Sequence, residues 1–419
     1  MDARASVAAG RAVSAVWRIE SARIVATLAR VTGDFALAED LAQDALAEAL
    51  RAWPRDGVPD NPGAWLTAVA KRRAIDGWRR RDRLDARYAA IAHDLAEAKD
   101  AEWEPIPDDV LRLIFTACHP VLSREAQVAL TLRVVGGLTS EEIAAAFLVS
   151  VPTIQARITR AKKTLRAARV PFEVPDPSEW QPRLGSVLAV LYSIFTEGYA
   201  ATSGESWVRD DVAREALRLA RVLARLVPRE PEALGLLALM ELQVSRLASR
   251  TDADGEPVLL PDQDRSRWDR SATARGRGAL RALDALGRGR GAYGLQAGIA
   301  EVHAVAPRYE DTDWDRIVLL YEALGRIAPS HVVELNRAVA VSLSSAPGGG
   351  PAAALEIVDG LVADGALKDS HLLPAVRGEL LARLGRLDEA RTELLRAADL
   401  AGNATRRRSL LGKALALGE

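Results

Sequence analysis

The amino-acid sequence predicts an all-α protein, and two observations support this fold class. Segments rich in Ala, Leu, Arg and Glu, with apolar residues at helical spacing, dominate the 419-residue chain. Alternating runs of Val, Ile and Thr, which indicate strands, are almost absent. Hydrophobic residues make up 49% of the chain, so it can bury a sizeable core, and general disorder is excluded.

Charge and cysteine content limit the classes of function. The formal net charge is −1, so any signal for nucleic-acid binding must be local. The single cysteine, Cys118, excludes a disulfide framework and fits a reducing compartment. The first 20 residues lack the apolar core of a signal peptide, and the uncharged run at 184–196 is too short to span a bilayer. We therefore expect a cytoplasmic protein with no membrane partner.

The first informative helix is predicted over 34–50, DFALAEDLAQDALAEAL. Asp40 and Asp44 are one turn apart, with Gln43 beside them, and the other side of the helix is apolar. An acidic helical face favours a basic partner surface. Taken alone, however, the pattern fits a solvated face better than a binding surface.

A basic helix is predicted at 71–83, KRRAIDGWRRRDR. Arg72, Asp76, Arg79 and Arg83 fall on one face, at i, i+4, i+7 and i+11. Two tryptophans, at positions 65 and 78, lie nearby in the sequence. Basic residues interleaved with aromatic rings suit a nucleic-acid strand whose bases are unstacked, whereas the alternative is a structural helix with core tryptophans.

An acidic linker is predicted at 84–110, because this stretch carries eight acids against two bases and ends in a Pro-Ile-Pro-Asp-Asp run. The segment 121–169 that follows predicts a helix-turn-helix. Thr139 and Glu142 form a capping box that opens its first helix, and Ser150 caps the second. A buried stripe is expected on the second helix at Ile154, Ile158, Ala161 and Leu165.

The opposite surface of this second helix is polar and basic. Between 151 and 169 there are six basic residues and no acid. Arginines can neutralise phosphates while short polar groups at the helix N-terminus read base edges, so the pattern favours the major groove of DNA over an ordinary solvated face. The residues on this surface are Thr153, Gln155, Arg157, Arg160, Lys162, Lys163 and Arg166.

The second half of the chain predicts a helical array. Four prolines within 171–182 exclude a single helix, so the main domain boundary is placed there. A long charged connection is expected at 249–271; its Asp252-x-Asp254-Gly255 run lacks the spacing of a calcium loop and favours a polar loop. Residues 371–403 resemble a tetratricopeptide repeat, with a similar pattern about 36 residues earlier. The small or apolar positions of this repeat are Gly378, Ala390, Leu394 and Ala397.

Signals for catalysis are weak. Cys118 and His119 adjoin, but neighbouring helical residues point apart and no second cysteine exists for a thiolate-rich zinc site. The acidic group at 310–315 fits helix N-terminal charge more simply than a metal site. No P-loop or GxSxG motif occurs. We therefore expect no enzyme, no catalytic residue, no bound metal and no cofactor.

The order of these segments resembles an extracytoplasmic-function sigma factor. The similarity is carried by Glu39-Asp40-Leu41-Ala42-Gln43-Asp44, by Pro62, Trp65-Leu66, Ala74-Ile75-Asp76 and Arg79-Arg80, and by Leu138, Glu142-Ile143-Ala144, Thr153, Arg157 and Arg160-Ala161-Lys162. Further stretches, among them IFTEGYAA, DQDRSRWDR and TDWDRIVLLYEAL, resemble the subgroup with a fused C-terminal tetratricopeptide-like domain.

The resemblance implies that the protein binds core RNA polymerase and promoter DNA, and it implies roles for particular residues. The residues implied to bind polymerase are Glu39, Asp40, Gln43 and Asp44. Those implied to bind the minus-ten element are Trp65, Lys71, Arg72, Asp76, Arg79, Arg80 and Arg83. Those implied to bind the minus-thirty-five element are Thr153, Gln155, Arg157, Arg160, Lys162 and Lys163. Two departures concern specificity. Many relatives have Asn where this chain has Arg72, and two lysines, at 162 and 163, replace the more usual arginines and lose bidentate geometry.

The expected domains are therefore sigma region 2 at 1–83, the acidic linker at 84–110, region 4 at 111–170, the proline-rich joint at 171–182 and the helical regulatory domain at 183–419. The regulatory domain is expected to bind a protein partner, because such arrays usually do. The alternative function is a helix-turn-helix regulator with a tetratricopeptide-like sensor domain that works without polymerase. That alternative leaves 34–50 and 71–83 unexplained.

Overall fold

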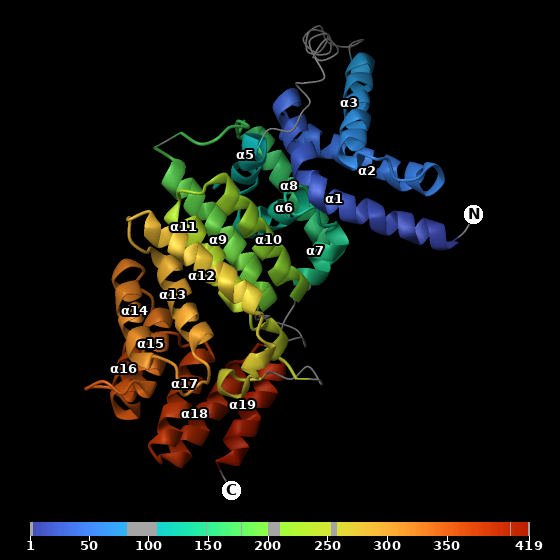
Figure 1. The fold of residues 1–419 in the computed structure, drawn as a ribbon. Coiled ribbons are helices and arrows are strands. Elements are labelled where there is room, and N and C mark those ends of the chain that lie inside the picture. The colour runs from blue at the N-terminus through green and yellow to red at the C-terminus, as the bar shows by residue number, and fades with distance from the viewer. Residues whose placement is uncertain are drawn as a thin grey trace. The chain divides into compact units, whose positions relative to one another are not determined.

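A computed structural model describes residues 3–81, 107–147, 149–176, 178–199, 210–252, 258–402 and 404–417. All of the regular elements within these ranges are helices, which confirms the predicted all-α class (Figure 1). Most of the predicted acidic linker and all of the Asp254-Gly255 pair lie outside the described ranges. None of the described helices is long and apolar enough to cross a membrane.

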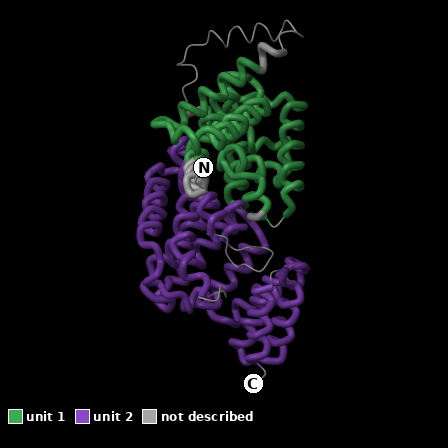
Figure 2. Tube along the Cα trace, turned by 90° about the vertical axis from the view of Figure 1, so that its right-hand side faces the viewer, with its two compact units in different colours: residues 1–193 green, residues 194–419 purple. Residues whose placement is uncertain are grey.

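The chain divides into two compact units, residues 1–193 and 194–419 (Figure 2). The first unit contains α1 (Ala3–Thr32), α2 (Phe35–Asp56), α3 (Pro62–Arg81), α5 (Pro107–Ala117), α6 (Arg124–Val134), α7 (Ser140–Phe147) and α8 (Val151–Ala167). The division falls inside α9 (Trp180–Tyr199), after the proline-rich segment 171–182.

In the first unit, α1 and α2 form a tight helical pair. Gly33 has a φ of +66° and turns the chain between the two helices. The side chain of Asp34 then caps α2, since its Oδ1 accepts hydrogen bonds from the backbone N–H groups of Ala36 at 2.9 Å and Leu37 at 3.1 Å. The buried face of α2 is rich in alanine, and these small side chains allow close helix packing.

The predicted helix-turn-helix is confirmed as α7 and α8. The backbone N–H of Thr139 donates to Glu142 at 2.8 Å and that of Glu142 donates to Thr139 Oγ1 at 3.1 Å, which is a complete capping box. Ser150 caps α8. The buried residues of α8 are the predicted stripe, namely Ile154, Ile158, Ala161 and Leu165.

The first half of α9 packs within the first unit. The ring of Trp180 lies 5.1 Å from that of Phe115, and Arg183 Nη2 donates to the Phe115 carbonyl at 3.1 Å. Leu184 and Val187 are also buried. The proline-rich segment therefore ends before the first unit does.

The second unit is built from helices that pack against their sequence neighbours. They are α10 (Asp210–Leu226), α11 (Pro231–Val244), α12 (Arg270–Ala285), α13 (Ala292–Val305), α14 (Trp314–Ile327), α15 (His331–Leu343), α16 (Pro351–Ala363), α17 (Leu372–Arg383), α18 (Leu387–Leu400) and α19 (Ala404–Ala416). In its described residues, the connection between α11 and α12 carries three short 3₁₀ turns, η2 (Leu247–Ser249), η3 (Leu260–Asp262) and η4 (Arg265–Arg267).

Small residues allow two of these helix crossings. A Cβ atom at Gly378 of α17 would lie 2.9 Å from Leu394 Cγ and 3.1 Å from the Ala390 carbonyl oxygen of α18. Three of the residues named for the last repeat, Gly378, Ala390 and Leu394, therefore meet across one helix pair. A Cβ at Gly235 of α11 would lie 2.6 Å from the backbone nitrogen of Gly294 in α13.

Candidate polymerase and promoter interface

The acidic residues of α2 differ in exposure. The side chains of Asp40 and Asp44 are 68% and 59% exposed, and Gln43 is half-buried. Glu39, in contrast, is buried at 3%. Only part of the acidic motif therefore lies on the surface.

The polar face of α8 is largely open. Gln155, Arg160 and Lys163 are exposed, whereas Thr153, Arg157 and Lys162 are half-buried. The Thr153 hydroxyl lies 2.8 Å from Ser150 Oγ, so the helix cap fixes its position. This face can place several cations and an amide along a DNA groove.

Residues assigned to different partners contact each other in the first unit. The Lys162 amine of α8 forms ion pairs with Glu39, and with Asp40 Oδ1 at 2.8 Å. Burial alone would lower the pKa of Lys162, but the attraction of the two carboxylates raises it, so the amine stays charged. Arg166 Nη2 binds Asp34 Oδ2 at 2.7 Å. These five residues are called the α2–α8 contact below.

Buried Glu39 has a second cationic partner, Arg133 of α6, with Nε at 3.4 Å. Arg133 Nη1 also donates to the Leu138 carbonyl at 3.1 Å, which ties the start of the helix-turn-helix to α2. Two cations thus compensate the cost of burying this carboxylate.

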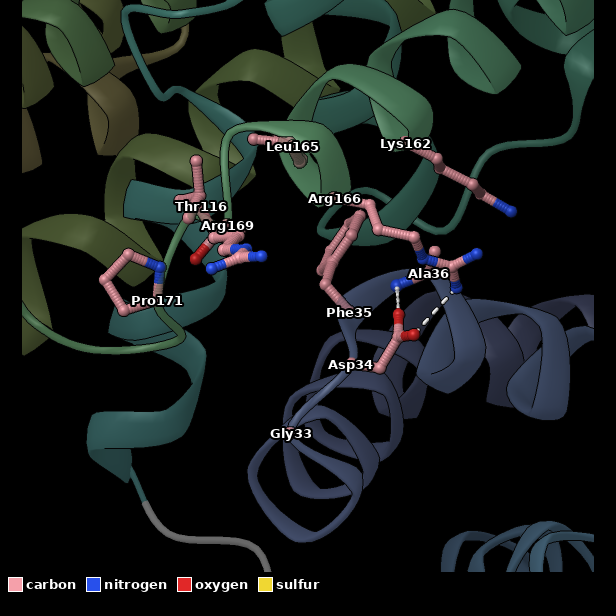
Figure 3. A pocket seen from close by; sticks show the side chains of 11 residues that line it. Gly33, Asp34, Phe35, Ala36, Thr116, Lys162, Leu165, Arg166, Arg169 and Pro171 are labelled. Carbon is pink, nitrogen blue, oxygen red and sulfur yellow. Dashed lines mark hydrogen bonds and ion pairs between the residues drawn. The ribbon is translucent and has the colours of Figure 1, made fainter. Parts of the chain in front are cut away.

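A cavity of about 320 Å³ lies beside the α2–α8 contact. It is bounded by the turn between α1 and α2 on one side and by the C-terminal end of α8 on the other. Figure 3 shows Asp34 at its edge, joined both to the backbone of Ala36 and to Arg166. The same carboxylate therefore caps α2 and holds α8.

The residues proposed for the minus-ten element lie on or near α3. Arg72 and Asp76 are exposed, and Lys71 is half-buried. Trp65 is half-buried and its ring lies 5.6 Å from that of buried Trp53, so it also has a packing role. The side chains of Trp78, Arg79 and Arg80, and the whole of Arg83, lie outside the described part of the chain.

Sequence reasoning missed several residues that position these helices. Arg73 joins α3 to α2, with Nη2 at 2.9 Å from Glu48 Oε2 and Nη1 at 3.6 Å from Asp44 Oδ2. Asp109 of α5 is buried and binds Arg30 of α1 at 2.7 Å. These partners are 25 or more residues apart, so helical periodicity carries no signal for them.

The adjacent Cys118 and His119 do not form a reactive pair in the structure. Burial raises the pKa of the Cys118 thiol to about 11, and its Sγ lies 3.3 Å from Thr131 Oγ1. The thiol is therefore neutral at physiological pH and unsuited to nucleophilic chemistry. Within the described residues, no group of three or more His, Cys, Asp or Glu side chains could hold a metal ion.

Comparison with known proteins shows where the chain belongs. The family model of sigma-70 region 2 matches residues 18–84, and that of sigma-70 region 4 matches 112–165. Residues 183–283 match a family of unknown function, DUF6596. No solved structure matches the chain significantly.

Similar curated proteins agree with these matches. A protein of Rhizobium meliloti (strain 1021), described as uncharacterized, is 45% identical over 383 residues, which is 88% of this chain and 87% of that protein. The ECF RNA polymerase sigma factor SigK of Mycobacterium ulcerans is 30% identical over 148 residues, 34% of this chain and 78% of SigK. The probable ECF sigma factor SigI of Mycobacterium tuberculosis is 29% identical over 173 residues, 40% of this chain and 58% of SigI.

The fold and the two matched regions define a transcription initiation factor of the sigma-70 class. More particularly, the chain belongs to the extracytoplasmic-function (ECF) family of RNA polymerase sigma factors and carries an additional helical C-terminal domain. Its function is promoter-directed transcription initiation, which implies binding to core RNA polymerase and to promoter DNA.

Proposed function

We propose that α2 binds the polymerase core through Asp40, Asp44 and Gln43, with Glu39 joining once α8 has left, and that α3 and α8 bind the promoter. The observation that carries this proposal is the charge segregation of the first unit, with exposed carboxylates on α2 and exposed cations on α8. The acidic surface of α2 and the basic surface of α8 are each attracted to a partner of opposite charge, so the two surfaces bind different partners.

In this proposal α3 and α8 divide the promoter between them. Exposed Gln155 and Arg160, with Arg157, Thr153, Lys162 and Lys163, bind the minus-thirty-five duplex. Arg72, Lys71, Asp76 and Trp65, with Arg79, Arg80 and Arg83, bind the melted minus-ten strand. A half-buried tryptophan, Trp65, two helical turns before exposed Arg72 supports this second role, because an aromatic ring can replace base stacking.

The α2–α8 contact represents a closed arrangement of the sigma regions in this proposal. Lys162 cannot neutralise a DNA phosphate while it pairs with Glu39 and Asp40. The same pairing weakens the attraction between Asp40 and a basic surface of polymerase. Binding both partners therefore requires α8 to leave α2. The separated charges then find new partners of opposite sign, which offsets the lost ion pairs.

Two variants test the division of labour. Arg160→Gln should weaken binding to a duplex carrying only the upstream element and lower its salt slope by about one unit. Arg72→Gln should instead weaken binding to a pre-melted minus-ten template. Arg55→Gln, which removes an exposed charge at the end of α2, is the matched control. If both promoter variants affect both templates equally, the proposed division is wrong.

A third variant tests the polymerase surface. Asp44→Asn removes a carboxylate that is 59% exposed without placing a new cation beside Arg73. Core affinity should fall while the unfolding free energy changes by less than about 0.5 kcal/mol. Unchanged core affinity in a pull-down would contradict the assignment.

The proposed sigma domains keep the limits expected from the sequence, but the first compact unit extends through the first half of α9 to residue 193. The C-terminal domain is proposed to regulate the sigma regions and to bind a protein partner. A domain can regulate only by favouring one arrangement of the regions over another, and the closed contact supplies two arrangements to choose between. The proposed location is the cytoplasm, where core polymerase and chromosomal DNA are found.

A further inference from the structure

The second unit contains a group of arginines and aromatic rings that the sigma function does not use. It lies where the end of α9, η2, η4 and the end of α13 come together, within residues 194–419. The arginine–aromatic cluster consists of Tyr199, Arg246, Arg250, Arg265, Trp268 and His303. Several of these residues belong to the IFTEGYAA and DQDRSRWDR segments noted in the sequence.

The rings hold the guanidinium groups in fixed positions. The Arg250 Cζ atom lies 3.8 Å from the centre of the Tyr199 ring, and that of Arg246 lies 5.8 Å from it. The Arg265 Cζ atom lies 4.6 Å from the centre of the Trp268 ring. Such stacking orients a guanidinium group but leaves its N–H donors at the edge free to bind a further acceptor.

Backbone contacts fix Arg265 further. Its Nη1 donates to the carbonyl oxygens of His303 and Ala306, both at 2.7 Å. The ring of His303 in turn packs edge-on against Trp314, with centroids 5.2 Å apart. The cluster is therefore built on the ends of two helices rather than on surface side chains alone.

Buried donors without acceptors are concentrated here. Within the described residues, Arg250 Nε, Arg265 Nη2 and Trp268 Nε1 are buried and have no hydrogen-bond partner. The Tyr199 hydroxyl and His303 Nδ1 are also buried without a hydrogen-bond partner among the described residues. The first three atoms can only donate, so what they lack is an acceptor. Native proteins seldom leave such groups unsatisfied, which points to a missing acceptor at this place.

The charge at the cluster is also unbalanced. Burial lowers the pKa of Arg250 and of Arg265, and repulsion from Arg246 lowers both further. Arg406 of α19 adds to the positive potential, since it and Arg250 repel each other. An anion at the cluster would relieve this repulsion and supply the missing acceptor.

The described carboxylates near Arg265 do not provide that anion. Asp311 attracts Arg265 only through space, because both of its oxygens bind Arg308 at 3.0 Å. Glu310 also attracts Arg265 but is exposed. Asp264 is the N-cap of η4, and its carboxylate accepts hydrogen bonds from the backbone N–H and the hydroxyl of Ser266.

We propose that the arginine–aromatic cluster is a binding site for a small oxyanion ligand, recognised through its phosphate or carboxylate group. Arg250 Nε and Arg265 Nη2, the unpartnered nitrogens of two stacked guanidinium groups, offer charged N–H donors that such oxygens accept. The rings of Tyr199 and Trp268 cover one face of each guanidinium group, so the anion would bind at the edges of these groups. The proposal concerns binding alone and does not depend on the regulatory role of the domain.

The test uses the full chain without polymerase or DNA. Inorganic phosphate and citrate are titrated separately by calorimetry at constant ionic strength, with chloride as the reference anion. These two probes distinguish a phosphate site from a carboxylate site. At least one probe should bind and raise the melting temperature in proportion to its saturation of the site.

Arg250→Met is the decisive variant, and Arg281→Met, at an exposed position on α12, is its matched control. Arg250→Met should weaken binding of the probe at least tenfold. In chloride it should not lower the melting temperature, because it removes a buried charge that forms no ion pair with the described residues. Arg281→Met should leave probe binding unchanged.

Three outcomes would overturn the proposal. The first is that neither phosphate nor citrate binds more tightly than chloride. The second is that a probe binds but Arg250→Met and Arg281→Met weaken it equally, which would place the bound anion elsewhere. The third is a lower melting temperature of Arg250→Met in chloride together with unchanged probe binding, which would mean that Arg250 only supports the fold.

Discussion

At the scale of single residues, the environment of Glu39 explains how an acid can be buried in a protein surface that binds other molecules. Its carboxylate is 3% exposed and contacts both Lys162 and Arg133. Removing either cation would leave a buried charge with one partner. Lys163, the next residue along α8, is exposed and is an ideal comparison because it carries the same charge.

Lys162→Ala should lower the free energy of unfolding by about 1–2 kcal/mol, because Arg133 compensates Glu39 only in part. The same variant should bind core polymerase more tightly, since it weakens the contact that covers α2. Urea unfolding and a fluorescence binding titration measure the two effects. Lys163→Ala should change neither quantity appreciably, and equal effects of the two variants would contradict the closed arrangement.

His303 makes a pH-dependent contribution to stability. Burial, reinforced by repulsion from Arg246 and Arg265, lowers its pKa to about 3. The unfolded chain therefore binds a proton at higher pH than the folded chain, so stability is lost as the pH falls below the usual histidine pKa of about 6.5. Between pH 7.5 and 5.5 this residue should account for about 1.4 kcal/mol of lost unfolding free energy.

His303→Gln should reduce that pH dependence, as measured by urea unfolding at the two pH values. His331→Gln, at an exposed position on α15, is the control for losing a histidine. If both variants keep the pH dependence of the unfolding free energy of the original protein, His303 is not the source of that dependence.

At the scale of helices, the second unit depends on how closely its backbones approach. Gly235 of α11 faces the backbone of Gly294 in α13, where an added Cβ would lie 2.6 Å from a nitrogen atom. Backbone atoms cannot move aside as a flexible side chain can. The crossing of α11 and α13 therefore requires glycine for space rather than for its dihedral freedom.

Gly235→Ala should destabilise the protein by about 1–3 kcal/mol, because it forces the two helices apart. Gly325→Ala on α14 is the matched control, since its Cβ would meet nothing within 4 Å. The control should be neutral or stabilise by up to about 1 kcal/mol through helix propensity. Thermal unfolding of both variants measures the difference; destabilisation by both would mean that helix packing is not the cause.

At the scale of the whole molecule, the position of α9 determines where the chain can be cut. Its first half buries Leu184 and Val187 within the first unit, and Trp180 packs on Phe115. A cut at the proline-rich segment would remove these residues and expose apolar surface. A cut after Ser193 follows the division between the two units.

A chain of residues 1–193 should keep helical content and bind promoter fragments but transcribe less than the full chain from its promoter. A chain of residues 1–182 should be less stable, because it loses the buried side chains of α9. Circular dichroism checks folding, and transcription is compared at equal protein concentration. Full activity of a well-folded 1–193 chain would contradict a regulatory role for the C-terminal domain.

Local sequence determined the features that depend on neighbouring residues. The capping box at Thr139 and Glu142, the cap at Ser150 and the buried stripe of α8 were all predicted correctly, because a helix fixes which residues three or four positions apart share a face. The small residues that meet between α17 and α18 follow the same rule. The order of such segments was enough to indicate the sigma family.

Only the tertiary structure decided which of these segments contact each other. The pairing of Lys162 with Glu39 joins residues more than 120 positions apart, and the arginine–aromatic cluster gathers residues from separate helices and turns. The composition of a segment does not specify its distant partner, since any exposed acid can attract any exposed base. The choice is made by packing, because the fold brings only certain pairs close and excludes the water that would otherwise weaken their attraction.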